Sequence, residues 1–239
     1  VSDHPINPDF AREAAARGLR VTHTSTFLSM AVAGERNLLT GIKAVEAGYP
    51  LRGNLRIAAE LFAADAPTRA LPAAGEVWVD TRLANGLGVK PGDNVEVGAA
   101  RFRIAAVLTF EGERGGNFMA LAPRLMLNAT DLAQTGLLRE GSRVVYRLLV
   151  AAANIGDNTQ LIRFQEWAKP RLARGEQLED VRDARPELRQ VLDRAQRYLG
   201  LSALLTVLLA AAATQMALRR YVQRHFDQFA LLRCFGASR

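Results

Sequence analysis

One uncharged stretch constrains the fold of this chain more than any other feature. Residues 199–218 read LGLSALLTVLLAAAATQMAL and contain no Asp, Glu, Lys or Arg. As an α-helix that rises about 1.5 Å per residue, twenty residues span about 30 Å, the thickness of the hydrocarbon core of a bilayer. The stretch therefore predicts a transmembrane helix. The alternative is a buried central helix of a soluble α-helical domain.

The basic residues of the chain are concentrated beside this stretch. The 239-residue chain has a formal net charge of +7, of which residues 219–239 carry +4 and the other 218 residues +3. Positive charge next to an apolar span anchors and orients a membrane helix. We therefore expect contact with membrane lipid and no binding of nucleic acid. Arginines also occur at 181–198, so the Lys/Arg count alone does not orient the span.

The residues before the span predict a helix that continues into it. Pro186 suits the first position of a helix, and apolar residues follow at helical spacing: Leu188, Val191, Leu192, Ala195 and Leu199. No Gly-Pro break separates this amphipathic face from the apolar stretch. We expect one helix over about 186–224, with a stalk at 186–198 and the transmembrane segment at 199–218.

Residues 1–185 alternate between strand and helix patterns, which predicts an α+β domain. A Pro- and Ala-rich stretch at 65–75 marks the point at which two subdomains would divide. The predicted elements are a helix at 9–17, paired strands at 19–33 and 37–45, a strand at 76–80, a helix at 81–87, a hairpin at 95–107 after a Pro-Gly turn, and an amphipathic helix at 160–172. Trp78 and Trp167 lie within apolar patterns and are expected to pack in the core.

The sequence offers little chemistry. Cys234 is the only cysteine, which excludes an intramolecular disulfide and a zinc site with two or more thiolates. The histidines, His4, His23 and His225, have no partners at metal-ligand spacing. There is no Gly-x-x-x-x-Gly-Lys-Ser/Thr motif, so any ATPase must be a separate subunit. We predict no catalytic, cofactor or metal residue, and hence that the chain is not an enzyme.

A family resemblance emerges after the span. Residues 230–239 read ALLRCFGASR, preceded by the apolar stretch and a basic turn, and the string resembles a motif of FtsX-like permeases. These are the membrane subunits of the MacB, LolC/LolE and FtsX group of ABC transporters. The resemblance implies a cytoplasmic coupling helix, ended by a glycine, that docks onto an ATP-binding subunit. Its docking residues would be Phe229, Leu231, Leu232, Arg233, Gly236, Ala237 and Ser238.

Two further sets of residues extend the resemblance over the whole chain. The block 77–107, with its Lys-Pro-Gly-Asp turn, resembles the extracytoplasmic domain of MacB-type permeases. The pieces 112–118, 121–125, 141–150 and 219–222 resemble permeases often encoded beside an esterase or lysophospholipase. Such permeases have more membrane helices than this chain, which also begins with Val rather than Met. We therefore expect a segment of a longer protein.

The resemblance implies a location and a function. Residues 1–185 would form a periplasmic domain of the MacB core type, and 219–239 would be cytoplasmic, in a bacterial inner membrane. The chain would couple ATP hydrolysis in a separate ATPase subunit to a conformational change in the periplasmic domain. That domain would act on lipids, other hydrophobic compounds or a periplasmic partner such as the esterase or lysophospholipase. The alternative is a membrane-anchored scaffold that holds a periplasmic esterase and transports nothing.

Overall fold

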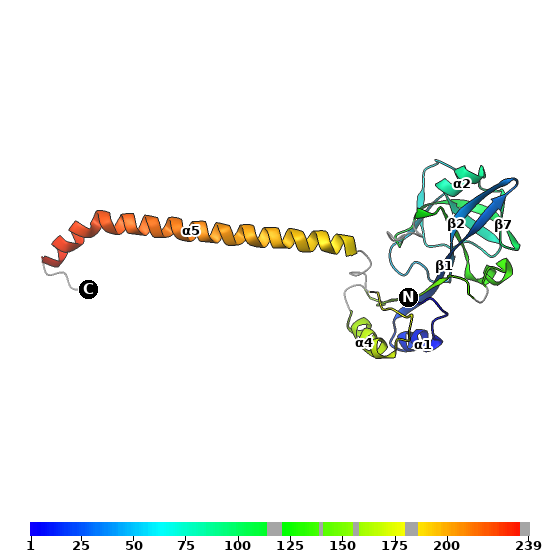
Figure 1. Ribbon diagram of the computed structural model, residues 1–239, viewed down its shortest axis with the longest axis horizontal. Helices are drawn as coiled ribbons and strands as arrows, with labels where there is room; N and C mark the ends of the chain where they lie inside the picture. The colour runs from blue at the N-terminus through cyan, green and yellow to red at the C-terminus, as the bar shows by residue number, and fades with distance from the viewer. Residues whose placement is uncertain (114–120, 139–140, 155–157, 180–185, 235–239) are drawn as a thin grey trace. The chain divides into compact units, whose positions relative to one another are not determined.

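The computed structural model describes residues 1–113, 121–138, 141–154, 158–179 and 186–234. The chain divides into two compact units, Val1–Asp180 and Val181–Arg239. The first contains nine strands and several short helices, and the second contains one long helix (Figure 1). The predicted α+β class is confirmed. The stretch 65–75 lies inside the first unit and holds one short strand, and the domain limits drawn from the sequence remain predictions.

The strands of the first unit belong to one sheet. They are β1 (Arg20–Ala33), β2 (Arg36–Val45), β3 (Leu55–Ala58), β4 (Ala66–Thr68), β5 (Glu76–Asp80), β6 (Asn94–Val97), β7 (Ala100–Phe110), β8 (Arg124–Asn128) and β9 (Val145–Ala151). Because β6 pairs with both β1 and β7, the strands β7-β5-β8-β2-β1-β6 form a closed circuit. Strands β3 and β4 extend from β7, and β9 pairs with the first half of β1.

The longest strands form the hairpin that the sequence predicts. Strands β1 and β2 pair antiparallel, with Ala33 opposite Arg36 across a turn in which Gly34 has a φ of 58°. Side chains alternate between the two faces of a strand. Ile42 and Ala44 are accordingly fully buried on the inner face, whereas Lys43 between them is directed to the outer face.

Helix α2 (Thr81–Leu87) has the bounds that its sequence predicts, because both of its ends carry strong local signals. Asp80 caps the first turn, its Oδ1 accepting a hydrogen bond from the Leu83 amide at 2.8 Å. Gly88 ends the helix in the left-handed conformation, at a φ of 70°. The Pro-Gly turn that follows places Gly92 at a φ of 99°, also as expected for a type II turn.

The hydrophobic core of the first unit has three parts. The largest lies inside the strand circuit and includes the buried residues of α2. A second lies on the outer face of the sheet and contains Tyr49, Trp78 and Met126. The third joins α1 (Pro8–Ala16) and α4 (Thr159–Ala168) to β1 and β9. Trp78 and Trp167 are therefore packing residues, as predicted.

Helix α4 covers the sheet, as the amphipathic pattern at 160–172 predicts. The rings of Phe10 in α1 and Trp167 in α4 meet edge to face, with centroids 5.7 Å apart. The α-helix ends at Ala168, and the 3₁₀ turn η3 (Lys169–Arg171) replaces its predicted last turn. Pro170 explains the change, because proline has no amide hydrogen to continue the α-helical ladder. Two further 3₁₀ turns are η1 (Ala129–Asp131) and η2 (Ala133–Thr135).

The second unit contains α5 (Pro186–Cys234), a helix of 49 residues. It begins at the predicted proline and passes through the stalk and the apolar stretch without a break. The family motif implies a basic turn and a separate short helix after the span, but α5 continues beyond residue 224 to Cys234 and curves toward its end (Figure 1). Residues 219–234 contain no Gly or Pro to interrupt the helix.

Candidate functional site

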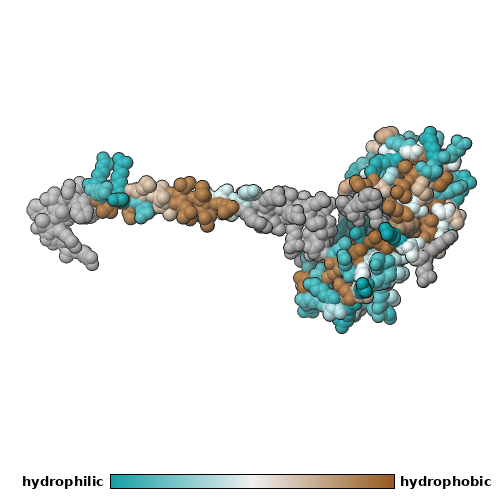
Figure 2. Space-filling model, viewed as in Figure 1, coloured by the Kyte–Doolittle hydropathy of each residue, from teal (hydrophilic) through white to brown (hydrophobic). Residues whose placement is uncertain are grey.

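The apolar half of α5 is the first candidate site. Within the residues that the structure describes, one segment, Tyr198–Arg224, is long and apolar enough to cross a membrane. Its large apolar side chains are between 48% exposed at Val222 and 72% exposed at Met216. Figure 2 shows an apolar band, coloured brown, along the middle of the helix. None of that segment is buried within the described residues, whereas the core helix of a soluble domain is mostly buried.

Two polar side chains in this band form hydrogen bonds inside the helix. The Thr206 hydroxyl donates a hydrogen bond to the Ser202 carbonyl at 2.8 Å, and the Thr214 hydroxyl donates to the Ala210 carbonyl at 2.8 Å. In a hydrocarbon solvent an unsatisfied hydroxyl costs several kcal/mol, so internal bonds of this kind suit a helix that faces lipid. The span predicted at 199–218 thus has the length and apolar composition of a helix that crosses a membrane.

The basic and docking residues predicted from the sequence follow directly after the band. Arg219, Arg220 and Arg224 are exposed on α5, where Figure 2 shows hydrophilic side chains after the apolar band. Of the predicted docking residues, Phe229, Leu231, Leu232 and Arg233 lie on the last turns of α5, and Gly236, Ala237 and Ser238 lie outside the described residues. The docking role remains a prediction.

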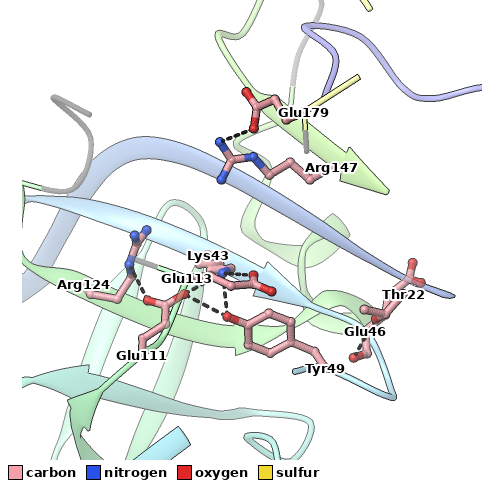
Figure 3. Close-up of polar contacts among 9 residues, drawn as sticks. All are labelled: Thr22, Lys43, Glu46, Tyr49, Glu111, Glu113, Arg124, Arg147 and Glu179. Carbon is pink, nitrogen blue, oxygen red and sulfur yellow. Dashed lines mark hydrogen bonds and ion pairs between the residues drawn. The ribbon is translucent and has the colours of Figure 1, made fainter. Parts of the chain in front are cut away.

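A buried group of charged residues in the first unit was not expected from the sequence. Lys43, Tyr49, Glu111, Glu113 and Arg124, here called the Lys43 cluster, meet on the outer face of the sheet (Figure 3). They come from β2, the loop after β2, the residues following β7, and the start of β8. The cluster therefore joins two regions that are distant in the sequence, since Lys43 lies 68 positions and Tyr49 62 positions before Glu111.

Glu111 is the centre of this cluster. Its Oε1 accepts hydrogen bonds from Lys43 Nζ at 2.5 Å and from the Tyr49 hydroxyl at 3.0 Å. Its Oε2 lies 3.2 Å from Arg124 Nε in an ion pair. Lys43 Nζ also donates to Tyr49 Oη at 2.7 Å and to Glu113 Oε2 at 3.3 Å. Two cations and two anions thus balance, and Glu113 is the one partly exposed member, with 35% of its side chain accessible.

Burial and charge act in opposite directions on the ionisation of this cluster. Burial acts to raise the pKa of Glu111, but attraction from Lys43 and Arg124, with the hydrogen bonds from Lys43 and Tyr49, outweighs it and lowers that pKa. Burial also raises the pKa of Tyr49, and the nearby negative charge of Glu111 and Glu113 raises it further. Glu111 therefore stays ionised and Tyr49 stays protonated at neutral pH.

The Lys43 cluster is an ion-paired network that holds separate strands together. The Glu111 carboxylate is paired with Lys43 and Arg124, and both cations favour its ionised form. One sequence signal could have revealed it: Lys43 stands alone in the apolar run 41–45, and buried strand positions hold lysine only when it is paired. Its carboxylate partner, 68 positions away, gave no local signal.

His4 and His23 of the first unit each lie beside a carboxylate. His23 Nδ1 lies 2.8 Å from Glu46 Oε2, and His4 Nδ1 lies 2.8 Å from Asp3 Oδ1. Across the described residues, no group of three or more His, Cys, Asp or Glu side chains is arranged to hold a metal ion. His225 lies on α5. The Gly-rich stretch 112–116 lies partly outside the described residues, since only Gly112 and Glu113 are described.

Comparison with known proteins gives one strong similarity. No protein-family model matches the chain. Over 238 residues it is 35% identical to a protein of Escherichia coli (strain K12) described as the uncharacterized ABC transporter permease YbbP. The match takes in 100% of this chain and 28% of that protein, so the chain spans less than a third of its relative's length. This similarity agrees with the resemblance to ABC transporter permeases found in the sequence.

Solved structures give weaker similarities. The extracellular domain of the noncanonical ABC-type transporter YknZ from Gram-positive bacteria aligns with a TM-score of 0.48 at 13% identity, covering 73% of this chain and 88% of that one. The periplasmic region of MacB from Actinobacillus actinomycetemcomitans aligns with a TM-score of 0.44 at 14% identity, covering 67% of this chain and 72% of that one.

Proposed function

We propose that this chain, which is similar along its whole length to part of an ABC transporter permease, is the outer domain, membrane helix and coupling segment of such a permease. In the proposed arrangement the nine-stranded unit lies outside the cytoplasmic membrane of a bacterium. Residues 199–218 cross the membrane, and the end of α5 docks onto an ATPase subunit in the cytoplasm. The observation that carries the proposal is the exposed apolar band of α5. The similarity of the chain to a protein described as an ABC transporter permease supports it.

The coupling role rests on the continuity of α5. A helix of 49 residues at about 1.5 Å per residue is about 73 Å long, more than twice the hydrocarbon thickness. A movement imposed on Phe229, Leu231 or Leu232 by closure of the ATPase would reach the outer end of the same rigid element. The outer unit would then change its engagement with a lipid, another hydrophobic compound or a periplasmic partner. An adjacent esterase is one candidate for that partner.

The test is docking of the C-terminal end of α5. In the full-length permease, Leu232→Asp places a charge at a predicted apolar contact. Gln228→Asp, one turn earlier on the same helix, adds the same charge at a position with no predicted docking role. Co-purification with the ATPase subunit and the rate of ATP hydrolysis would be measured for both variants. We expect Leu232→Asp to lose both, and Gln228→Asp to keep both. Unchanged docking and turnover in Leu232→Asp would overturn the coupling role and leave the scaffold alternative.

A further inference from the structure

Two segments far apart in the sequence meet at one edge of the first unit. The backbone nitrogen of Val1 donates to the Gln177 carbonyl, and the Gln177 amide donates to the Val1 carbonyl, each at 2.8 Å. Ser2 and Tyr146 exchange the same pair of bonds, also at 2.8 Å each. Successive residues of an extended strand direct their backbone groups to opposite sides. Val1 and Ser2 therefore lie as a short middle strand between Gln177 and β9.

Side chains reinforce this contact on both sides of the backbone pairs. Arg147 of β9 forms an ion pair with Glu179 at 3.6 Å (Figure 3). His4 Nε2 lies 3.7 Å from Glu176 Oε1, and the Glu176 side chain is only 6% exposed. The other oxygen of Glu176 accepts a hydrogen bond from the Ala173 amide at 2.8 Å, which closes a turn just before Gln177.

Gly175 marks how closely the two segments approach. Its φ of 91° is one that residues with a side chain rarely adopt, and a Cβ built there would lie 2.5 Å from Asp3 Oδ1. The segment 175–179 is therefore fitted against residues 1–4 and not merely adjacent to them. Together these contacts fix the part of the chain that leads toward Pro186, the first residue of α5.

We propose that residues 175–179 form a clasp that transmits displacement of α5 to the sheet of the outer unit. This inference rests on the proposed function. The path runs from Gln177 through Val1 and Ser2 to β9, which pairs with β1 from Arg20 opposite Ala151 to Thr26 opposite Val145. Strand β1 is the longest of the sheet and is the partner of β2, β6 and β9. A displacement of residues 175–179 thus reaches β1 through backbone hydrogen bonds.

Without the clasp, residues 175–179 would add to the length of chain that connects the sheet to α5. Extended chain that is not hydrogen-bonded absorbs a displacement through its own dihedral angles, because few contacts resist the change. The clasp removes the slack that these five residues would add. Residues 175–179 are accordingly positioning residues, whose release would weaken the transmission of a displacement while the core of the outer unit stays intact.

The clasp can be opened by removing one backbone donor. Gln177→Pro lacks the amide hydrogen that donates to the Val1 carbonyl, whereas the matched control Gln177→Ala keeps it. Both variants would be made in the full-length permease, reconstituted in lipid nanodiscs with its ATPase subunit. Hydrogen exchange of the β9 amides, followed by mass spectrometry with and without ATP, is the readout.

Three results of this experiment are informative. We expect an ATP-dependent change in β9 exchange for the wild type and Gln177→Ala, and a reduction of about fivefold or more in that change for Gln177→Pro. An undiminished change in a folded Gln177→Pro variant would overturn the clasp and leave the proposed function standing. Absence of any change in the wild type would overturn the proposed coupling, and the role of the clasp with it.

A second variant covers the case in which the proline prevents folding. Arg147→Glu places two carboxylates opposite each other at the clasp, and adding Glu179→Arg restores the pair with exchanged charges. We expect the single variant to weaken the ATP-dependent change and the double variant to regain it. A merely stabilising role would not predict this, because it would alter the unfolding midpoint without altering the response to ATP. Equal responses in the single and double variants would contradict the clasp.

Discussion

The two units of this chain place charged and apolar side chains in opposite ways. In the first unit Lys43, Glu111 and Arg124 are buried, with 3%, 6% and 5% of their surfaces exposed. In α5 the leucines are exposed, Leu204 at 61% and Leu209 at 64%. The first arrangement is stable in water because each buried charge is paired, and the second is stable only where the surroundings are apolar. The difference favours water as the solvent of the first unit and an apolar environment, such as lipid, around α5.

The largest effect expected from this comparison is loss of the buried carboxylate. Glu111→Gln leaves Lys43 and Arg124 buried without an anion between them, and breaking a buried pair costs about 3–5 kcal/mol. Glu113→Gln is the matched control, because that carboxylate is partly exposed and lies 3.3 Å from the same lysine. Its loss should cost less than about 1 kcal/mol. Urea unfolding measures both. Equal losses would mean that Glu111 is not the centre of the cluster.

The next largest effect is expected from a charge placed in the apolar band of α5, and it tests whether lipid surrounds that band. Leu208→Arg places a charge at the middle of the apolar band, which costs about 2.5–3.5 kcal/mol at the centre of a membrane helix. The same substitution at Leu39 of β2, 49% exposed in the first unit, should change stability by about 0.5 kcal/mol or less. Alkaline extraction of membranes would show how much of each variant is inserted. Full insertion of Leu208→Arg would mean that this band does not face lipid.

A smaller loss is expected from one hydroxyl of the cluster. Tyr49→Phe removes the donor to Glu111 and an acceptor for Lys43, and an unmade buried hydrogen bond costs about 1–3 kcal/mol. Tyr198→Phe on α5 is the control, since Tyr198 is 66% exposed and its loss should be within about 0.5 kcal/mol. Thermal unfolding of the first unit within the full chain is the measurement. An unchanged melting temperature in Tyr49→Phe would show that Glu111 is held by Lys43 and Arg124 without the tyrosine hydroxyl.

Acid should weaken the first unit through the same carboxylate. The pKa of Glu111 is lowered in the folded state, so its ionisation stabilises the fold above the unfolded pKa of about 4.3. That stabilisation is lost as the pH falls through the lower, folded pKa. Unfolding in urea from about pH 7 to about pH 3 should therefore show a steeper decline for the wild type than for Glu111→Gln. Parallel curves would contradict the lowered pKa.

Local signals explain which parts of this molecule could be predicted from the sequence. The bounds of α2 follow from Asp80 and Gly88, and the β1–β2 hairpin follows from its alternating pattern and Gly34. The span of α5 follows from the absence of charge over residues 199–218. All of these depend on neighbours within a few positions.

The features that escaped prediction depend on distant partners. Lys43 meets Glu111 across 68 positions, and Val1 meets Gln177 across 176 positions. Neither the ion pair of Lys43 and Glu111 nor the backbone hydrogen bonds of Val1 and Gln177 produce a periodic pattern in the sequence, because each contact involves single residues that the fold brings together. The unbroken end of α5 is a different case: a family motif favours a turn there, while the local residues contain nothing that stops a helix.

The smallest expected effect concerns a hydroxyl in the apolar band. Thr206 donates to the Ser202 carbonyl, which as an α-helical acceptor is already satisfied by the backbone amide four residues later. Thr206→Val keeps the shape of the side chain and leaves no acceptor unpaired, so stability in detergent should change by about 0.5 kcal/mol or less. A thermal shift assay of the solubilised chain measures it. A loss well above that figure would mean that the hydroxyl also bonds to another membrane helix, so that this face of α5 packs against protein rather than lipid.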